Sequence, residues 1–268
     1  MNHLLRDLAP ISDKAWELID GEARRSLKHY LAARRLVDFA GPLGWQASAV
    51  DLGRVERLPA GPGADVDAAR RRVVALVELR IPFSLGRDEL EDAERGAEDL
   101  DLGPLIDASR SAALGEDHAI FNGYSSGGIA GIAPSSPLEP ITITDDYGAY
   151  PTQVAKAVEM LRAADVGGPY AIAMGTRGYT GVIETTEHGG YPVFEHLRQI
   201  LGGSVVWAPA VDGAIVLSER GGDYEMTVGE DFSIGYRSAS DESVAFYLEE
   251  SLAFRINTPD AAVVLMYE

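Results

Sequence analysis

Cysteine is absent from the 268 residues, which excludes disulfides and thiolate metal sites. Basic residues are scarce as well: 23 Lys and Arg stand against 42 Asp and Glu, a net charge of −19. A surface of that sign repels phosphate backbones and anionic lipids, so we expect neither nucleic acid nor a membrane as a partner. The densest basic stretch, Arg70-Arg71-Arg72, has acids on both sides and is typical of a solvated strand or loop.

Long apolar runs are also missing. The first residues lack the apolar core of a signal peptide, and no segment reaches membrane-spanning length. Apolar residues nevertheless make up 46% of the chain and charged residues 24%, an ordinary balance for a globular protein. We therefore expect a folded, soluble, cytoplasmic protein.

Periodicity in the first half predicts helices and a β-hairpin. An amphipathic run capped by Ser12 predicts a helix that ends before Gly41-Pro42. β-like patterns at 47–55 and 73–83 flank a stretch of turn formers, which predicts a long hairpin arm. Because an isolated two-stranded hairpin is marginal in water, the arm indicates a partner chain. A second long helix is expected from Pro104 to about Asn122.

Strands alternate with helices between residues 134 and 220, which predicts a mixed subdomain there. After Gly221-Gly222 the pattern becomes largely β, and we expect these last strands to pair back with the first part of the chain. The fold class predicted by the whole pattern is α+β.

One catalytic motif is present. Gly123-Tyr124-Ser125-Ser126-Gly127 matches G-x-S-x-G, the nucleophile elbow of serine hydrolases, which needs a strand before the serine and a helix after it. Here a helix is expected before it, so a serine hydrolase acting through Ser125 is kept only as an alternative. The five histidines are scattered and form no spaced ligand set, and no phosphate-binding loop occurs. We expect no metal, no cofactor and no enzymatic activity.

Short motifs in a shared order resemble the shell proteins of encapsulins. The first are Leu8-Ala9-Pro10, the block from Arg34 to Asp38, and Gly41-Pro42-Leu43-Gly44-Trp45. The later ones, also in family order, are Glu94-Arg95-Gly96, Glu116-Asp117, Gly168-Pro169-Tyr170, Tyr191-Pro192, Arg220-Gly221-Gly222-Asp223 and Ser233-Ile234-Gly235-Tyr236. The resemblance spans the whole chain.

This resemblance implies the tailed-phage major capsid protein fold, with a peripheral domain, an axial domain and an extended arm. Its segments would be a peripheral part with the N-terminal helix (1–48), the arm (49–76), a peripheral part with the spine helix (77–133), the axial domain (134–220) and returning peripheral strands (221–268). The implied function is a hollow icosahedral nanocompartment, self-assembled from many copies. A phage capsid protein proper is the second alternative, although a charge of −19 argues against packaged DNA.

The resemblance also implies a partner and two sites. The partner is a cargo enzyme carrying a C-terminal targeting peptide, a dye-decolourising peroxidase or a ferritin-like protein. The peptide would bind the end of the N-terminal helix and the last strands, through Leu27, Leu31, Arg34, Val37, Asp38, Phe232, Ile234, Tyr247 and Leu248. A pore at the five-fold axis would be lined by Glu184, Thr185, Thr186, Glu187, His188, Gly189 and Gly190.

Overall fold

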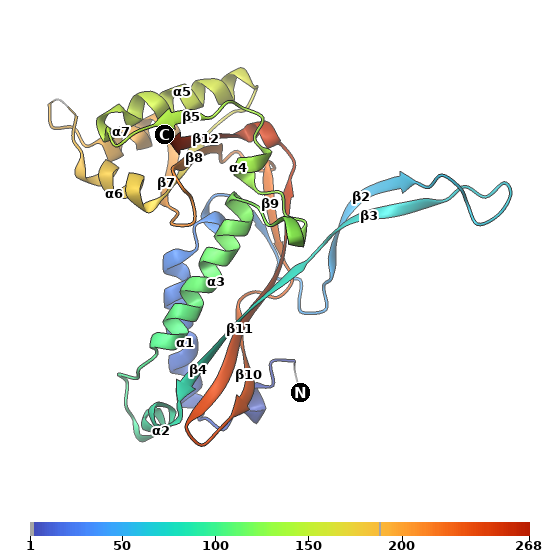
Figure 1. Cartoon of the computed structure of the whole chain (residues 1–268), viewed down its shortest axis with the longest axis vertical. Helices are drawn as coiled ribbons and strands as arrows, with labels where there is room; N and C mark the ends of the chain where they lie inside the picture. The colour runs from blue at the N-terminus through green and yellow to red at the C-terminus, as the bar shows by residue number, and fades with distance from the viewer. Residues whose placement is uncertain (1–2, 188) are drawn as a thin grey trace.

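The computed structural model describes residues 3–187 and 189–268. These residues form two five-stranded sheets, each accompanied by helices, and a two-stranded ribbon that projects from the body (Figure 1). The predicted α+β class is therefore confirmed.

The first sheet is built around one long strand, β11. Its strand order is β1-β9-β11-β10, and β4 pairs with the opposite edge of β11 over ten residues. All of these pairs are antiparallel except β1 with β9. The strands are β1 (Asp38–Ala40), β4 (Val77–Gly86), β9 (Tyr224–Val228), β10 (Ser233–Ala239) and β11 (Ser243–Ile256).

Two long helices lie beside this sheet, and a shorter one caps its lower end (Figure 1). They are α1 (Asp13–Tyr30), α2 (Arg87–Arg95) and α3 (Gly103–Phe121). The helix α1 begins where predicted, because Ser12 Oγ accepts the backbone N–H of Ala15 at 3.2 Å. Its apolar stripe, which includes Ile19 and Leu27, packs into one core with α3 and the sheet.

The helix ends before Gly41-Pro42, as predicted, but it ends as early as Tyr30, so Arg34, Val37 and Asp38 lie beyond it. The carboxylate of Asp117 on α3 accepts the backbone N–H groups of Ala32 and Ala33, at 3.0 and 2.8 Å. These bonds turn the chain into a short 3-10 helix at Ala33–Arg35. The acceptor lies 85 residues away along the chain, so local periodicity could not reveal it.

The hairpin expected between residues 49 and 76 forms, and it projects from the body as an arm (Figure 1). It consists of β2 (Ala49–Arg57) and β3 (Ala69–Ala75), paired antiparallel with an irregularity after Asp51. Val55 and Val73 on this ribbon are 55% and 53% exposed. These two valines therefore have little apolar cover from the described part of their own subunit.

The second sheet has the order β5-β12-β8-β6-β7. Its strands are β5 (Ile141–Ile143), β6 (Tyr170–Met174), β7 (Gly202–Trp207), β8 (Ala214–Ser218) and β12 (Ala262–Tyr267). Its helices are α4 (Ile132–Ser135), α5 (Tyr150–Ala163), α6 (Thr176–Glu184) and α7 (Val193–Leu201). Strands and helices alternate here, as the sequence pattern between residues 134 and 220 predicted.

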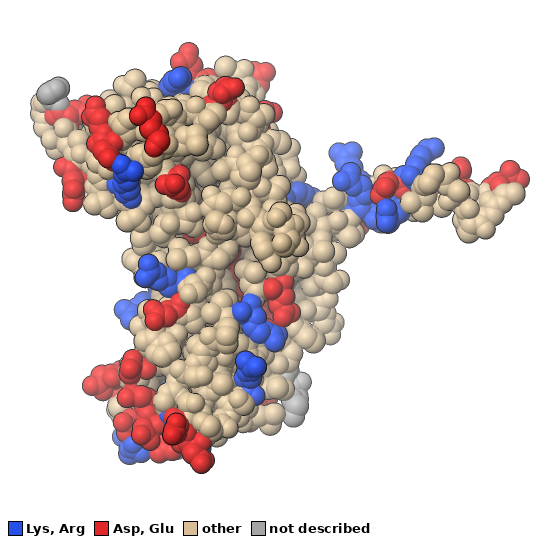
Figure 2. Space-filling view, viewed as in Figure 1, with Lys and Arg blue, Asp and Glu red and all other residues tan. Residues whose placement is uncertain are grey.

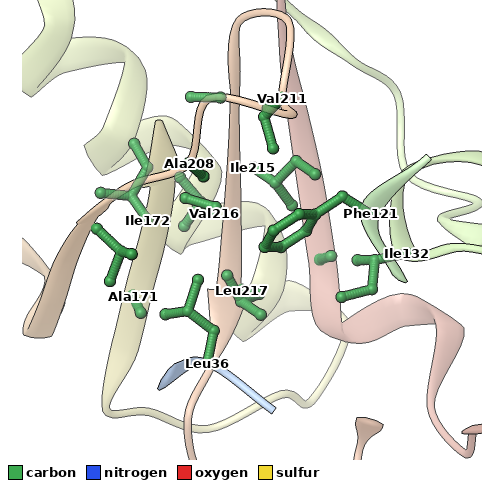
Figure 3. Close-up of a cluster of buried hydrophobic side chains, with 14 of the residues drawn as sticks. Leu36, Phe121, Ile132, Ala171, Ile172, Ala208, Val211, Ile215, Val216 and Leu217 are labelled. Atoms are coloured by element: carbon green, nitrogen blue, oxygen red, sulfur yellow. The ribbon is translucent and has the colours of Figure 1, made fainter. Parts of the chain in front are cut away.

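One apolar core runs from this sheet to the ends of the first part. Phe121, the last residue of α3, is fully buried beside Ile132 and Ile215, and Leu36 lies near Leu217 (Figure 3). These contacts fix the long helix α3 against the second sheet. The two parts therefore share packing as well as chain connections.

The expectation that all of 221–268 returns to the first part is wrong for the last strand. Strands β9, β10 and β11 do return, but β12 pairs with β8 and with β5 in the second sheet. A 3-10 turn at Pro259–Ala261 carries the chain across. The run from Ala262 to Met266 is apolar throughout, a pattern that fits the interior of either sheet.

Candidate functional site

A cavity of about 730 Å³ opens between α1 and the strands β10 and β11. We call it the α1–β10 groove. Its apolar lining comes from Leu4, Ala23, Leu27, Leu31, Phe232, Ile234 and Leu248. Its charged lining comes from Arg6, Asp20, Arg24, Lys28, Arg34, Arg35 and Asp231. An apolar floor surrounded by charged residues can bind the side chains of an extended peptide.

Six of the nine residues expected to bind cargo peptide line this groove. They are Leu27, Leu31, Arg34, Phe232, Ile234 and Leu248. The helix end and the returning strands are thus brought together, although about 200 residues separate them in the chain.

The other three lie elsewhere. Val37 and Asp38 follow the turn after α1 and line a separate cavity of about 150 Å³, where Asp38 accepts the backbone N–H of Gly222 at 2.5 Å. Tyr247 precedes Leu248 on β11 and therefore points to the opposite face of the sheet. There its hydroxyl donates to the backbone oxygen of His3 at 3.3 Å. These three residues do not line the groove, because the helix ends before Val37 and Asp38 and because strand neighbours alternate in direction.

Arg34 lies at the back of the groove in a network of ion pairs. Its Nε donates to Glu116 Oε2 at 2.8 Å, and its other nitrogens pair with Asp231 Oδ1 at 2.8 Å and with Glu250. The side chains of Glu116 and Glu250 are fully buried, whereas that of Arg34 is 16% exposed. Because its donors are engaged inside the subunit, Arg34 shapes the groove wall rather than offering free hydrogen bonds to a ligand.

The carboxyl groups around Arg34 have perturbed acidities. Burial raises the pKa of Glu116, against the lowering effect of the Arg34 guanidinium. Burial, with the nearby charge of Glu116, raises the pKa of Glu250 well above its usual range. Burial likewise raises the pKa of Asp117 to about 7. The pKa of Arg34 is itself raised, since its bonds to Glu116 and its other acidic neighbours outweigh burial. Burial thus raises the pKa of all three carboxyl groups, Glu116, Glu250 and Asp117.

Sequence reasoning missed the contribution of the N-terminal segment to the groove. Leu4 is buried and its backbone oxygen accepts the N–H of Tyr236 on β10, at 2.8 Å. Arg6 pairs with Asp20 at 2.7 Å and stacks over the Trp16 ring. The apolar pair before the helix, Leu4-Leu5, was the available signal, but it does not say which strand it meets.

The expected pore segment forms the connection between α6 and α7, which extends away from the body on the side opposite the arm (Figure 1). Glu184, Thr186, Gly189 and Gly190 are exposed, whereas Thr185 and Glu187 are half-buried. Glu187 Oε1 lies 2.7 Å from His196 Nδ1, so one of its oxygens is engaged within the subunit. His188 lies outside the described residues.

Ser125 does not sit on a nucleophile elbow. It begins a 3-10 turn at Ser125–Gly127, which follows the end of α3 after Asn122, Gly123 and Tyr124. The motif requires a strand before the serine, so the geometry needed to raise its hydroxyl above a sheet is missing from this segment.

A long helix beside a sheet, a separate second sheet and a projecting hairpin define a capsid-like shell subunit. The virus-like particle of Pyrococcus furiosus has this fold, with a TM-score of 0.67 over 93% of this chain and 98% of that one, at 17% identity. The capsid of Myoviridae phage XM1 matches with a TM-score of 0.52 over 86% of this chain and 89% of that one, at 9% identity. The predicted tailed-phage capsid fold is confirmed.

Sequence comparison identifies the family within this class of capsid-like proteins. Residues 1–253 match the family described as "Encapsulating protein for peroxidase". The type 1 encapsulin shell protein of Rhodospirillum rubrum is 50% identical over 270 residues, which cover 99% of this chain and 96% of that protein. The chain therefore belongs to the encapsulin shell proteins, a family of structural subunits and not of enzymes. None of the helices in the described ranges is long and apolar enough to cross a membrane.

Proposed function

We propose that copies of this chain close into an icosahedral shell in the cytoplasm and enclose a cargo enzyme whose C-terminal peptide docks in the α1–β10 groove. The observation that carries the docking proposal is the groove itself, which joins apolar side chains of the N-terminal helix and of the last strands in one cavity. The proposal has two parts, assembly and docking.

The arm supports assembly. Between residues 49 and 76 it holds five arginines and four acids, whereas the remainder of the chain holds 18 basic and 38 acidic residues. Figure 2 shows arginines on the ribbon with a few acids among them, whereas Asp and Glu gather at the lower end of the body, where α2 lies. An arm with a basic excess and exposed valines fits the acidic body of a neighbour. Repeated contacts of this heterologous kind close into a shell when the rotation between copies permits.

The lining supports docking of a peptide. A volume of about 730 Å³ accommodates several side chains, and the floor formed by Leu27, Leu31 and Ile234 is apolar. Arg24, Lys28 and Arg35 stand around it, so a peptide with apolar side chains and a terminal or side-chain carboxylate would be complementary. Because the matched family is described as encapsulating peroxidase, a dye-decolourising peroxidase is the first cargo to test and a ferritin-like protein the second.

The test is co-expression of the chain with a dye-decolourising peroxidase encoded in the same genome, either intact or without its C-terminal tail. Particles are isolated on a density gradient, imaged by electron microscopy and assayed for peroxidase per shell. Leu31→Glu places a charge in the apolar floor and should lower the peroxidase content at least about tenfold, which corresponds to about 1.4 kcal/mol of binding. Leu31→Met, which keeps volume and apolarity, is the matched control and should load normally.

The outcomes separate the two parts. If wild-type and Leu31→Glu chains both form shells and these shells contain equal amounts of peroxidase, the groove is not the docking site, but the assembly proposal stands. A monomer or dimer from the wild-type chain would overturn the shell. Loading that persists after removal of the peroxidase tail would place recognition outside the C-terminal peptide.

We also propose that the segment from Glu184 to Gly190 lines a pore around a symmetry axis. Its support is its projection from the end of the axial part and its exposed carboxylate at Glu184. An acidic ring favours cations. Because Glu187 is paired with His196, Glu184 is the stronger contributor.

A further inference from the structure

Three side chains from distant parts of the sequence converge outside the groove. His3 precedes the first helical turn, Glu230 lies between β9 and β10, and Glu249 is on β11. His3 Nε2 lies 2.6 Å from Glu230 Oε2 and 3.1 Å from Glu249 Oε1. One donor atom from each residue lies within 4.8 Å of the other two. The spacing in the sequence gives no hint of this grouping.

The three side chains are largely buried, and neighbouring residues fix their orientation. The side chain of Glu249 is 2% exposed, and those of His3 and Glu230 are 18% and 14% exposed. Arg80 donates to Glu249 Oε2 at 2.6 Å, which leaves Oε1 directed at the histidine. The His3 ring stacks on Trp45 with 4.4 Å between centroids and 7° between planes. Such outer contacts orient the side chains of a metal site.

Hydrogen bonding does not account for the arrangement. Within the described part of the chain, His3 Nε2, Glu230 Oε2 and Glu249 Oε1 are buried atoms without a hydrogen-bond partner. An imidazole carries at most one N–H at Nε2, yet two carboxylate oxygens approach that atom. Arg80 engages only the far oxygen of Glu249, so the two carboxylate oxygens that face His3 still compete for a single N–H. A divalent cation at the centre would neutralise both and satisfy all three atoms.

We propose that His3, Glu230 and Glu249 bind a divalent transition-metal cation. Ligand bonds of about 2.0–2.2 Å place neighbouring donor atoms roughly 3–3.5 Å apart. His3 Nε2 lies 2.6 and 3.1 Å from the two carboxylate oxygens, near the spacing that a bound ion requires. One imidazole nitrogen and two carboxylate oxygens suit Zn²⁺, Mn²⁺ or Fe²⁺ and offer nothing to a soft ion that needs sulfur. A cavity of about 210 Å³, lined in part by Trp45, Glu230 and Glu249, adjoins the site and gives the metal access to water ligands.

The site would clamp the N-terminal segment at the base of the arm. The adjoining cavity is also lined by Ser48 and Leu76, the residues directly before β2 and directly after β3. The backbone oxygen of His3 accepts the Tyr247 hydroxyl, which ties the same residue to the sheet. A bound metal would thus join the segment that enters the groove, the central strand and the root of the arm.

The test uses intact shells treated with EDTA and then equilibrated with Zn²⁺, with bound zinc counted by mass spectrometry. Wild-type shells should hold about one Zn²⁺ per chain at this site. His3→Ala and Glu249→Gln should each weaken binding at least about tenfold, because loss of even an outer contact typically costs a metal site that much. His29→Ala removes an exposed histidine of α1 and is the matched control.

A second readout does not depend on the ligand variants. Co²⁺ quenches tryptophan fluorescence at short range, and Trp45 stacks directly on His3. Co²⁺ should quench wild-type shells, excess Zn²⁺ should reverse the effect, and Trp45→Phe should abolish it. Zinc content below one per chain in wild-type shells, equal zinc in His29→Ala and His3→Ala shells, or quenching that survives Trp45→Phe would overturn the proposal.

Discussion

Replacing Arg34 with methionine should destabilise the subunit by leaving buried carboxylates without their cation. The substitution keeps a long apolar side chain against Phe39 and Phe232, whose rings lie 5.2 and 5.0 Å from the guanidinium carbon. It removes the pairs with Glu116 and Glu250, both fully buried. Breaking a buried ion pair by removing one partner costs about 3–5 kcal/mol. In a chain of this size each kcal/mol lowers Tm by about 2–4 °C, so we expect a loss on the order of 10 °C.

The loss should depend on pH. Burial raises the pKa of Glu116 and of Glu250, so in acid both carboxyls can take up protons and no longer need the guanidinium. The destabilisation by Arg34→Met should therefore be smaller at pH 5 than at pH 8. Differential scanning calorimetry of assembled shells, at one scan rate and after imaging, measures this directly.

A compensated variant separates charge from packing. Arg34→Met combined with Glu116→Gln and Glu250→Gln removes the uncompensated charges while keeping the shapes, and most of the lost Tm should return. If the triple variant unfolds as early as the single one, the loss comes from the packing of Arg34 and not from the buried charges. A Tm of Arg34→Met within 2 °C of wild type would refute the reasoning altogether.

Two further predictions concern the same subunit. The raised pKa of Asp117 means that the folded state holds its proton more tightly than the unfolded chain, so its stabilising effect is complete below about pH 4 and is lost as pH rises through about 7. Relative to wild type, the free energy of unfolding of Asp117→Asn should therefore rise by about 2–3 kcal/mol between pH 5 and 8, since each pKa unit is worth about 1.36 kcal/mol. Thermal unfolding of both proteins measures this difference, and a difference that stays constant with pH would contradict the prediction. In the pore, Glu184→Gln should lower the rate of Tl⁺ entry relative to iodide several-fold, and Glu187→Gln should lower it less because Glu187 is paired with His196. Stopped-flow quenching of a dye enclosed in the shell measures both rates. Unchanged Tl⁺ entry in Glu184→Gln shells would exclude an acidic filter.

The sequence predicted those parts of the fold that depend on local pattern. The cap at Ser12, the hairpin arm and the helix after Pro104 each follow from residues within a few positions of one another. The sequence pattern did not predict features that depend on a residue far away along the chain. Asp117 ends α1 from 85 residues away, and β12 joins the second sheet although its apolar run fits either sheet.

The candidate site divides along the same line. Local pattern places Leu27 on a helix, but only the resemblance assigned Leu27, Leu31 and Leu248 to a binding site, and all three line the groove. Tyr247 was assigned with its neighbour, although adjacent strand residues face opposite sides. The meeting of His3 with Glu249 depends on how the N-terminal segment lies over the sheet, which no spacing rule describes.

The position of β12 has a consequence for synthesis. It lies between β5 and β8, and β5 has no other neighbour in that sheet among the described residues. All the other strands of that sheet leave the ribosome before β12 does. A nascent chain can therefore form most of the first sheet while the second sheet still lacks β12, the strand that joins β5 to β8. Chains that stop early would keep an open sheet edge, which distinguishes unfinished subunits from finished ones before either can enter a shell.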